Sequence, residues 1–301
     1  FVAGVGNVGS QFLNILEKQQ ANFRENHQIE LKLVGVANSS RYLLDKDGLN
    51  FKTASNIRID GTPYPSSADF VDLIISHNLR NSIVIDNTAS EEVSLQYARL
   101  FNHSISVVTC NKFAGSSTIS NYEKLIKLTR DKNCKFQYET SVAAALPVIK
   151  TIQDLGHSGD RVNRIEAVLS GSLNFIFNNY NAERPFADIV QQAKDEGYTE
   201  PDPKIDLTGL DVMRKILILA RESGYMCEAE DVSFNGFLPE SSLKTETPEE
   251  FIASLRGEEA HFKKMYLEAQ QNNCRMKVVA VMDNGKLSVS LRQIDTASPL
   301  Y

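Results

Sequence analysis

The stretch Phe1-Val2-Ala3-Gly4-Val5-Gly6-Asn7-Val8-Gly9 decides the fold of the first half of the chain. Its glycines have the spacing Gly-x-Gly-x-x-Gly and stand between a short apolar segment and a helical pattern over residues 11–20. Glycine turns are common, so the motif gains its weight from these flanks and from an apolar strand pattern over residues 31–37. Glycines let a backbone approach a pyrophosphate, which the N–H groups of a helix N-terminus can bind. We therefore expect a dinucleotide to contact Gly4, Gly6, Asn7, Val8 and Gly9.

Strand and helix patterns alternate through the first 140 residues. Such alternation is typical of a parallel sheet with helices on both faces, so we predict an α/β fold with a Rossmann-type doubly wound parallel sheet over residues 1–140. From residue 141 the pattern changes, and a second, α+β domain is expected over residues 141–301. Asp283-Asn284-Gly285 is a strong hairpin signal there. The expected strands are 31–37, 82–85, 105–109, 135–139, 162–170, 277–282 and 286–292, and the expected helices are 11–20, 67–77, 92–100, 119–129, 148–155, 175–179, 186–196, 248–254 and 258–271.

Polar residues follow three of the expected strands, where open parallel sheets bind ligands. Asn38 and Arg41 follow the strand expected over 31–37, Asn87 and Thr88 follow the one over 82–85, and Lys112 follows the one over 105–109. No acidic residue stands near Asn38 to bind the adenosine ribose, whereas Arg41 suits a 2′-phosphate. We therefore predict NADP, with NAD as the alternative. The competing interpretation of Arg41 and Lys112 is that both are ordinary surface residues.

The densest polar stretch is Ala193–Lys215, AKDEGYTEPDPKIDLTGLDVMRK. Its two prolines exclude a helix interior, so we expect a helix to restart after Asp206. Asp211 and Lys215 would then lie one turn apart on the same helix face. An acid and an amine so placed, beside Glu200, suit proton transfer and the binding of a charged small molecule. A solvated surface ion pair is the competing interpretation.

Composition excludes several classes of protein. With 301 residues, 42% hydrophobic and 23% charged, the chain suits two globular domains. A net charge of −6 and the lack of a Lys/Arg-rich tract argue against a nucleic-acid partner. No apolar run approaches the ~18 residues that span a bilayer, so we expect no membrane partner. The four cysteines are scattered, which favours free thiols in a cytoplasmic protein over structural zinc.

The polar stretch resembles the signature of homoserine dehydrogenases at every fixed position. The likeness extends over nearly the whole chain, and the wording GYTEPDPKIDLTGLDVMRK is similar to the dehydrogenase portion of bifunctional aspartokinase–homoserine dehydrogenases. The signature residues are Ala193, Gly197, Tyr198, Thr199, Asp202, Pro203, Asp206, Leu207, Gly209, Asp211 and Lys215. Further matches are Gly4–Gly9, Asn87-Thr88, Asn111-Lys112, Glu139–Val142 and Ser170–Asn174. We expect residues 171–174 to form a turn.

The resemblance implies an oxidoreductase that interconverts L-homoserine and L-aspartate 4-semialdehyde with NAD(P), in threonine and methionine biosynthesis. It implies that Lys215 donates and accepts the proton on the substrate oxygen and that Asp211 orients it. Lys112 would lie between nicotinamide and substrate, and Glu200 would hold the substrate ammonium. The resemblance also implies a homodimer formed through the second domain. The other substrate-binding residues it implies are Asp206, Tyr198, Gly171 and Ser172.

A monovalent cation, usually sodium, is also implied by the resemblance. Its ligands would be the Glu139 carboxylate and backbone carbonyls in the segment that follows. Relatives usually carry glycines in this turn where the chain has Ala143 and Ala145, and alanine is costly wherever φ is positive. The implied carbonyl ligands are those of Val142, Ala144 and Leu146.

The ends of the chain lead us to expect a fragment. The resemblance places an aspartokinase before Phe1 and a further segment of the dehydrogenase after Tyr301. Two other functions stay open. One is a catalytically silent dinucleotide-binding regulatory module. The other is a different amino-acid semialdehyde oxidoreductase, because a fold alone sets no substrate.

Overall fold

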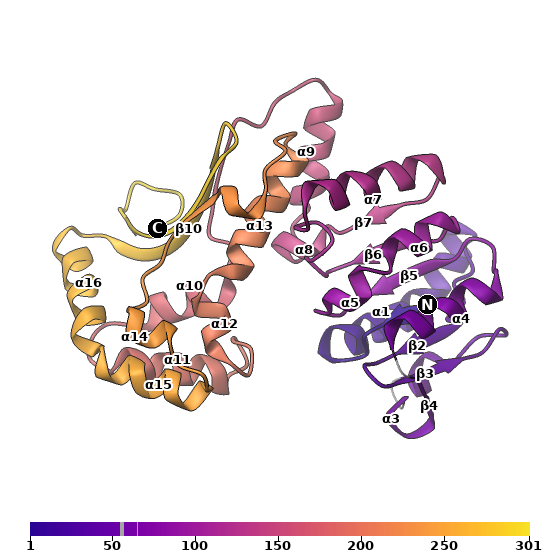
Figure 1. Ribbon diagram of the computed structural model, residues 1–301, viewed down its shortest axis with the longest axis horizontal. Helices are drawn as coiled ribbons and strands as arrows, with labels where there is room; N and C mark the ends of the chain where they lie inside the picture. The colour runs from indigo at the N-terminus through magenta and orange to yellow at the C-terminus, as the bar shows by residue number, and fades with distance from the viewer. Residues whose placement is uncertain (55–56, 65) are drawn as a thin grey trace. The chain divides into compact units, whose positions relative to one another are not determined.

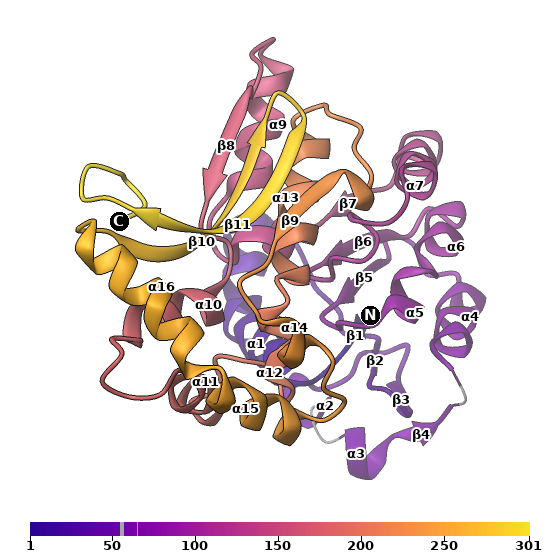
Figure 2. The ribbon, with the colours of Figure 1, turned by 60° about the vertical axis from the view of Figure 1, so that its left-hand side comes forward.

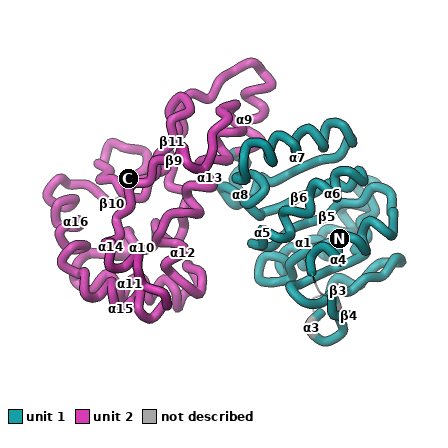
Figure 3. The backbone as a smooth tube through the Cα atoms, viewed as in Figure 1, with its two compact units in different colours: residues 1–148 teal, residues 149–301 magenta. Residues whose placement is uncertain are grey.

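The chain forms two units, Phe1–Val148 and Ile149–Tyr301 (Figure 3). Each unit has its own sheet. The structure, a computed structural model, describes residues 1–54, 57–64 and 66–301. The sequence-based boundary between residues 140 and 141 stays a prediction.

Unit 1 contains a seven-stranded sheet with the order β4-β3-β2-β1-β5-β6-β7. Five consecutive strands, β2-β1-β5-β6-β7, are parallel, as predicted, and β3 and β4, at one end of the sheet, pair antiparallel. The chain moves from β1 to β2 on one side of β1 and later to β5 on the other, which makes β1 the point where strand order reverses. The strands are β1 (Val2–Ala3), β2 (Gly35–Ala37), β3 (Arg41–Leu44), β4 (Thr62–Pro63), β5 (Ile83–Asp86), β6 (Ser106–Thr109) and β7 (Phe136–Gln137).

Helices cover both faces of this sheet (Figures 1 and 2). On one face, Leu13 of α1 joins Val2 and Val36 in one buried apolar cluster. On the other, the rings of Tyr97 and Phe101 pack on Phe136. Burial of side chains of this size contributes about 1.5–3 kcal/mol each. The helices are α1 (Asn7–His27), α2 (Phe51–Ala54) and α3 (Ile57–Asp60) on the first face, α4 (Ser67–His77), α5 (Glu91–Ser94), α6 (Tyr97–Asn102) and α7 (Ile119–Asp131) toward the second, and the short α8 (Thr140–Ala143).

Unit 2 is built on a four-stranded sheet with the order β8-β10-β11-β9. Asn284 and Gly285, with φ of 46° and 84°, form the predicted two-residue hairpin turn between β10 and β11. Helices α10, α13 and α16 pack against β10. The strands are β8 (Arg164–Ala167), β9 (Val232–Asn235), β10 (Arg275–Asp283) and β11 (Lys286–Ile294), and the helices are α9 (Val148–His157), α10 (Gly171–Asn179), α11 (Phe186–Asp195), α12 (Pro203–Leu207), α13 (Leu210–Glu222), α14 (Glu240–Leu243), α15 (Pro248–Gly257) and α16 (Glu259–Gln271), with a 3₁₀ turn at Ala229–Asp231.

Near the polar stretch, one sequence prediction was wrong and another was incomplete. Residues 171–174 form the first turn of α10 instead of a loop, because the Ser170 hydroxyl caps that helix by accepting from the N–H of Leu173. The helix predicted to restart after Asp206 is α13, but a short helix that the sequence did not predict, α12, comes before it and begins at Pro203. Asp202 caps it, and a proline in the first helical turn sacrifices no hydrogen bond.

Two predictions in unit 1 need a smaller correction. The strand predicted over 31–37 is reduced to Gly35–Ala37, the three residues that pair with β3. The helix predicted over 92–100 is split into α5 and α6 at Leu95 and Gln96. Within the described part of the chain, no helix is both long and apolar enough to cross a membrane.

Candidate functional site

The glycine turn joins β1 to the N-terminus of α1. Gly4 has a φ of 88°, which favours glycine, and a Cβ on Gly9 would lie 1.9 Å from the Gly4 carbonyl oxygen. The turn can therefore be this tight only with glycine at both places. Gly6 and Val8 are exposed and the first turn of α1 carries no acidic residue, so the positive end of the helix dipole is open to an anion.

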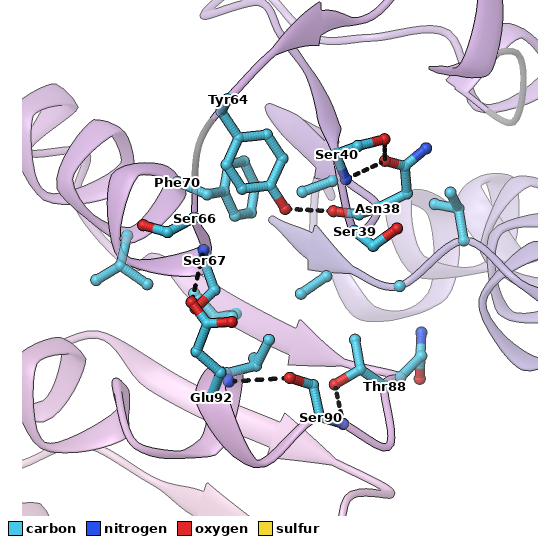
Figure 4. Close-up of a pocket in the computed structure, with 18 of the residues that line it drawn as sticks. Asn38, Ser39, Ser40, Tyr64, Ser66, Ser67, Phe70, Thr88, Ser90 and Glu92 are labelled. Atoms are coloured by element: carbon cyan, nitrogen blue, oxygen red, sulfur yellow. Dashed lines mark hydrogen bonds between the residues drawn. The ribbon is translucent and has the colours of Figure 1, made fainter.

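A cavity of about 750 Å³ lies beside this turn, at the carboxyl ends of β1, β2 and β5 (Figure 4). Asn38 shapes its wall, since its Oδ1 accepts hydrogen bonds from the N–H groups of Ser40 (2.9 Å) and Arg41 (2.8 Å). The Tyr64 hydroxyl donates to the Asn38 carbonyl. Burial, followed by the nearby carboxylates of Glu92 and Asp69, raises the pKa of Tyr64, so the hydroxyl stays a donor. The turn from Asn38 to Arg41 is thereby fixed by the Asn38 side chain and by the Tyr64 hydroxyl.

Arg41 and Glu92 place opposite charges on the cavity wall. The Arg41 guanidinium donates from Nη1 to the Gly61 carbonyl at 2.6 Å, which orients its fork. Glu92 accepts hydrogen bonds from the N–H and the hydroxyl of Ser67, and so ties α5 to α4. The guanidinium suits a phosphate, whereas the carboxylate suits a donor such as a ribose hydroxyl or an amino group.

Asn87 and Thr88 follow β5 on the same cavity. Asn87 Nδ2 is buried and has no hydrogen-bond partner among the described residues. Thr88 Oγ1 accepts from the N–H of Ser90 at 3.1 Å. A buried N–H donor without an acceptor is costly, so an acceptor such as a phosphate oxygen fits this place. The turn, the open helix end and this amide together fit a dinucleotide.

Lys215 and Asp211 form the predicted pair on α13. The Lys215 Nζ lies 2.7 Å from Oδ2 of Asp211 and donates to the Leu169 carbonyl at 2.8 Å. The lysine side chain is only 14% exposed, against 69% for the lysine of the similarly spaced pair Lys150–Asp154. An ammonium so enclosed is oriented, which distinguishes it from an ordinary surface ion pair.

Asp206 on α12 links two further segments of unit 2. Its Oδ1 accepts from the Ser172 hydroxyl at 2.8 Å, and its Oδ2 accepts from the N–H of Glu200 at 2.9 Å. Ser172 Oγ also lies 3.0 Å from Ser170 Oγ. The structure thus brings the start of α10, with Gly171 and Ser172, to the loop that carries Glu200. Tyr198 is half exposed and stacks on Phe175 at a ring distance of 4.2 Å.

The predicted cation segment lies at the end of unit 1. The residue with positive φ is Ala144, at 50°, whereas Ala143 and Ala145 are absent from the positive-φ residues of the described chain. The strain anticipated at those two alanines therefore falls on Ala144. Ser141 Oγ is buried without a partner among the described residues, and the Leu146 carbonyl accepts from Val148 at 2.9 Å. A search of the same residues finds no group of three or more His, Cys, Asp or Glu suited to a metal ion.

Cofactor candidates therefore gather in unit 1, with Lys112 half-buried after β6, and substrate candidates gather in unit 2. The sequence did not single out Tyr64, Asp86 or the Leu169 carbonyl. Asp86 carries a detectable signal, because it is a carboxylate at the end of the apolar strand Ile83–Asp86. The hydrogen-bond partners of Tyr64 and Lys215 lie 26 and 46 residues away in the sequence, so a local sequence pattern cannot predict them.

Comparisons with known proteins are consistent across both units. Residues 147–301 match the family profile described as homoserine dehydrogenase, and residues 4–139 match the homoserine dehydrogenase NAD-binding domain. A bifunctional aspartokinase/homoserine dehydrogenase of Haemophilus influenzae is 36% identical over all of this chain, which spans 37% of that protein. A homoserine dehydrogenase of Schizosaccharomyces pombe is 32% identical, over 99% of this chain and 82% of its own length. The chain thus spans little more than a third of the bifunctional relative.

Solved structures agree on the fold. A Candida auris protein of unknown function superposes with a TM-score of 0.84 at 29% identity, over 99% of this chain and 84% of that one. A hyperthermophilic archaeal homoserine dehydrogenase, solved with NADPH, superposes with a TM-score of 0.73 at 22% identity, over 99% and 82% of the two chains. The second likeness supports the fold alone.

Proposed function

Because the chain belongs to the homoserine dehydrogenase family, we propose that it interconverts L-homoserine and L-aspartate 4-semialdehyde with NAD(P)(H). The observation that supports this most directly is the enclosed Lys215 ammonium, held between Asp211 and the Leu169 carbonyl. No observation on the described residues favours a silent regulatory module, for which an oriented acid–amine pair would have no use.

The chemistry assigned to these residues is proton transfer. Bound NADPH supplies the hydride that reduces the aldehyde carbon. Lys215 donates its proton to the aldehyde oxygen, which becomes the hydroxyl of homoserine, and accepts it back in the oxidative direction. Asp211 keeps the ammonium pointed at that oxygen. Glu200 binds the substrate ammonium, while Asp206 fixes the backbone of Glu200 against α10.

We infer NADP as the preferred cofactor. Arg41 supplies a cation on the wall of the nucleotide cavity, and the adjacent Asn38-Ser39-Ser40 segment offers no acid to a ribose diol. Gly4, Gly6, Asn7, Val8 and Gly9 would hold the pyrophosphate, with Asn87 and Thr88 behind it. Lys112 is assigned to the contact between nicotinamide and substrate.

A sodium ion at Glu139 is a further part of the proposal. The unpartnered Ser141 hydroxyl and the positive φ of Ala144 suit a segment whose carbonyls turn toward a cation. Such an ion would orient carbonyls and take no part in proton transfer. The carbonyl ligands are assigned to Val142, Ala144 and Leu146.

The remaining proposals concern the parent protein. Bifunctional relatives support an aspartokinase domain in the parent chain. Four free cysteines support a reducing, cytoplasmic setting. The homodimer rests on the family resemblance.

The test of the function is Lys215→Ala in the full-length protein, assayed as NADPH formation from homoserine and NADP. We expect turnover to fall by at least about 10³-fold while NADPH binding is kept, because only the transition state uses this ammonium. Lys150→Ala, in the exposed pair of the same spacing, is the matched control and should retain full activity. Unchanged turnover in Lys215→Ala would refute the assignment. Faster turnover of another short hydroxy amino acid by the parent protein would redirect the substrate.

A further inference from the structure

Asp86, at the end of β5, is a fully buried carboxylate that no assigned role uses. Its Oδ1 accepts from the N–H of Thr88 at 2.8 Å. Its Oδ2 accepts from the Tyr97 hydroxyl at 2.5 Å and from Nδ2 of Asn111 at 3.1 Å. These donors are a backbone N–H, a phenol hydroxyl and a side-chain amide. All three donors are neutral, so the carboxylate is held by hydrogen bonds alone.

Asn111 is the second half of this arrangement and is 3% exposed. Its Nδ2 also donates to the Ser90 carbonyl at 2.8 Å, and its Oδ1 accepts from the N–H of Phe113 at 2.9 Å. One side chain thus touches the loop of residues 87–90 and the loop of residues 110–113. The first loop carries Asn87 and Thr88, and the second carries Lys112.

Stability alone does not account for a carboxylate at this place. Burial raises the pKa of Asp86, against the hydrogen bonds from Tyr97, Thr88 and Asn111 that lower it. A buried charge without an ionic partner costs free energy, and an apolar side chain of similar size would avoid that cost. What an apolar side chain cannot do is accept three hydrogen bonds at once and so hold two loops together.

We propose that Asp86 and Asn111 are positioning residues that lock the loop of Lys112 to the loop of Asn87 and Thr88. Binding of the nucleotide and placement of Lys112 are then set by one buried network. The catalytic half of this inference rests on the proposed function, and the binding half does not.

The test uses the full-length protein and NADPH, with binding followed by nicotinamide fluorescence. Asn111→Ala removes the hydrogen bonds to Asp86 and to the Ser90 carbonyl, and we expect the Kd for NADPH to rise about tenfold and kcat to fall at least about tenfold. Asp86→Asn, which is isosteric, should also raise the Kd for NADPH and lower kcat. This variant replaces Asn111→Ala in the test if Asn111→Ala does not fold. Tyr122→Phe is the matched control. It removes a different buried hydroxyl contact of unit 1, the one between Tyr122 and Tyr138, so it should lower the melting temperature and leave Kd and kcat within about threefold.

A double-mutant cycle separates positioning from a general loss of structure. In a Lys112→Met background, Asn111→Ala should lower kcat by less than about threefold, because the residue it positions is already gone. Equal fold losses of kcat in both backgrounds, or an unchanged Kd for NADPH in both Asn111→Ala and Asp86→Asn, would overturn the inference. The two proposals can also be told apart. If the Kd values for NADPH change as expected but the parent protein turns over no homoserine, the proposed function is wrong, whereas the positioning role of Asp86 and Asn111 in nucleotide binding is supported.

Discussion

Asp206 accepts a hydrogen bond of 2.8 Å from the Ser172 hydroxyl, across 34 residues of sequence. Its other oxygen accepts from the N–H of Glu200. Each carboxylate oxygen thus accepts one hydrogen bond from the protein, and Asp206 joins the start of α10 to the loop that presents Glu200. We therefore expect Asp206 to act mainly as a support for the substrate site.

Asp206→Ala and Asp206→Asn should therefore differ. An asparagine at this place can accept from the Glu200 N–H while its amide donates to Ser172, whose hydroxyl can turn to accept. We expect KM for homoserine to rise about tenfold in Asp206→Ala and less than about threefold in Asp206→Asn, with kcat little changed in both. Asp202→Asn is the control, because asparagine caps α12 as well as aspartate does. Equal damage from Ala and Asn would mean that the Asp206 charge acts on the substrate directly.

Arg41→Ala should change cofactor preference. The guanidinium, oriented by the Gly61 carbonyl, is expected to bind the 2′-phosphate that only NADP carries. KM for NADP should rise about tenfold or more, while KM for NAD stays within about twofold. The comparison of the two cofactors in one variant is its own control, since a misfolded loop would weaken both. Equal loss with both cofactors would contradict the assignment.

Sequence patterns predicted the features that depend on interactions between residues close together in the chain. The helix expected over 67–77 has the bounds of α4, and the turn at Asn284-Gly285 forms as expected, because backbone preference at these residues is strong. The pairing of Asp211 with Lys215 followed from helical spacing alone. The cap at Ser170 was missed although its hydroxyl bonds only three residues ahead.

The rest of the site depends on contacts between segments that are far apart in the chain. The spacing of residues in the sequence does not predict such contacts. The Leu169 carbonyl meets Lys215 only because the segment that joins β8 to α10 passes α13. Asp86 and Asn111 meet because β5 and β6 are neighbours in register, with Asp86 opposite Thr109. Strand patterns predicted both strands but not that pairing.

Because Asp86 is buried, the stability of the folded protein should depend on the protonation of this carboxyl group and therefore on pH. Its pKa is raised above 3.8, so the native state holds this proton more tightly than the unfolded chain does. The stabilisation from that proton is full at low pH and is lost as pH rises through the raised native pKa. Tyr97 and Cys110, the titratable neighbours, have pKa values raised by burial and titrate above this window.

Compared with Asp86→Asn, the wild-type protein should therefore gain stability on acidification from about pH 7 toward about pH 4. Melting temperatures of both proteins across this range give the difference directly, and titrations common to both cancel in it. A difference that shrinks on acidification would mean that the three hydrogen bonds outweigh desolvation and that the native pKa is lowered.

Ala144→Gly should stabilise unit 1. Ala144 has φ 50° and ψ −112°, a conformation that strains a residue with a Cβ and costs about 1–3 kcal/mol. Glycine removes the strain but adds about 0.4–1 kcal/mol of unfolded-state entropy, so the net gain should be about 1 kcal/mol. Ala143→Gly is the matched control, since Ala143 is helical and glycine there should cost about 0.5–1 kcal/mol. Urea unfolding of the two variants beside the wild type measures the opposite signs. Destabilisation by both would mean that residue 144 carries no strain that glycine can release.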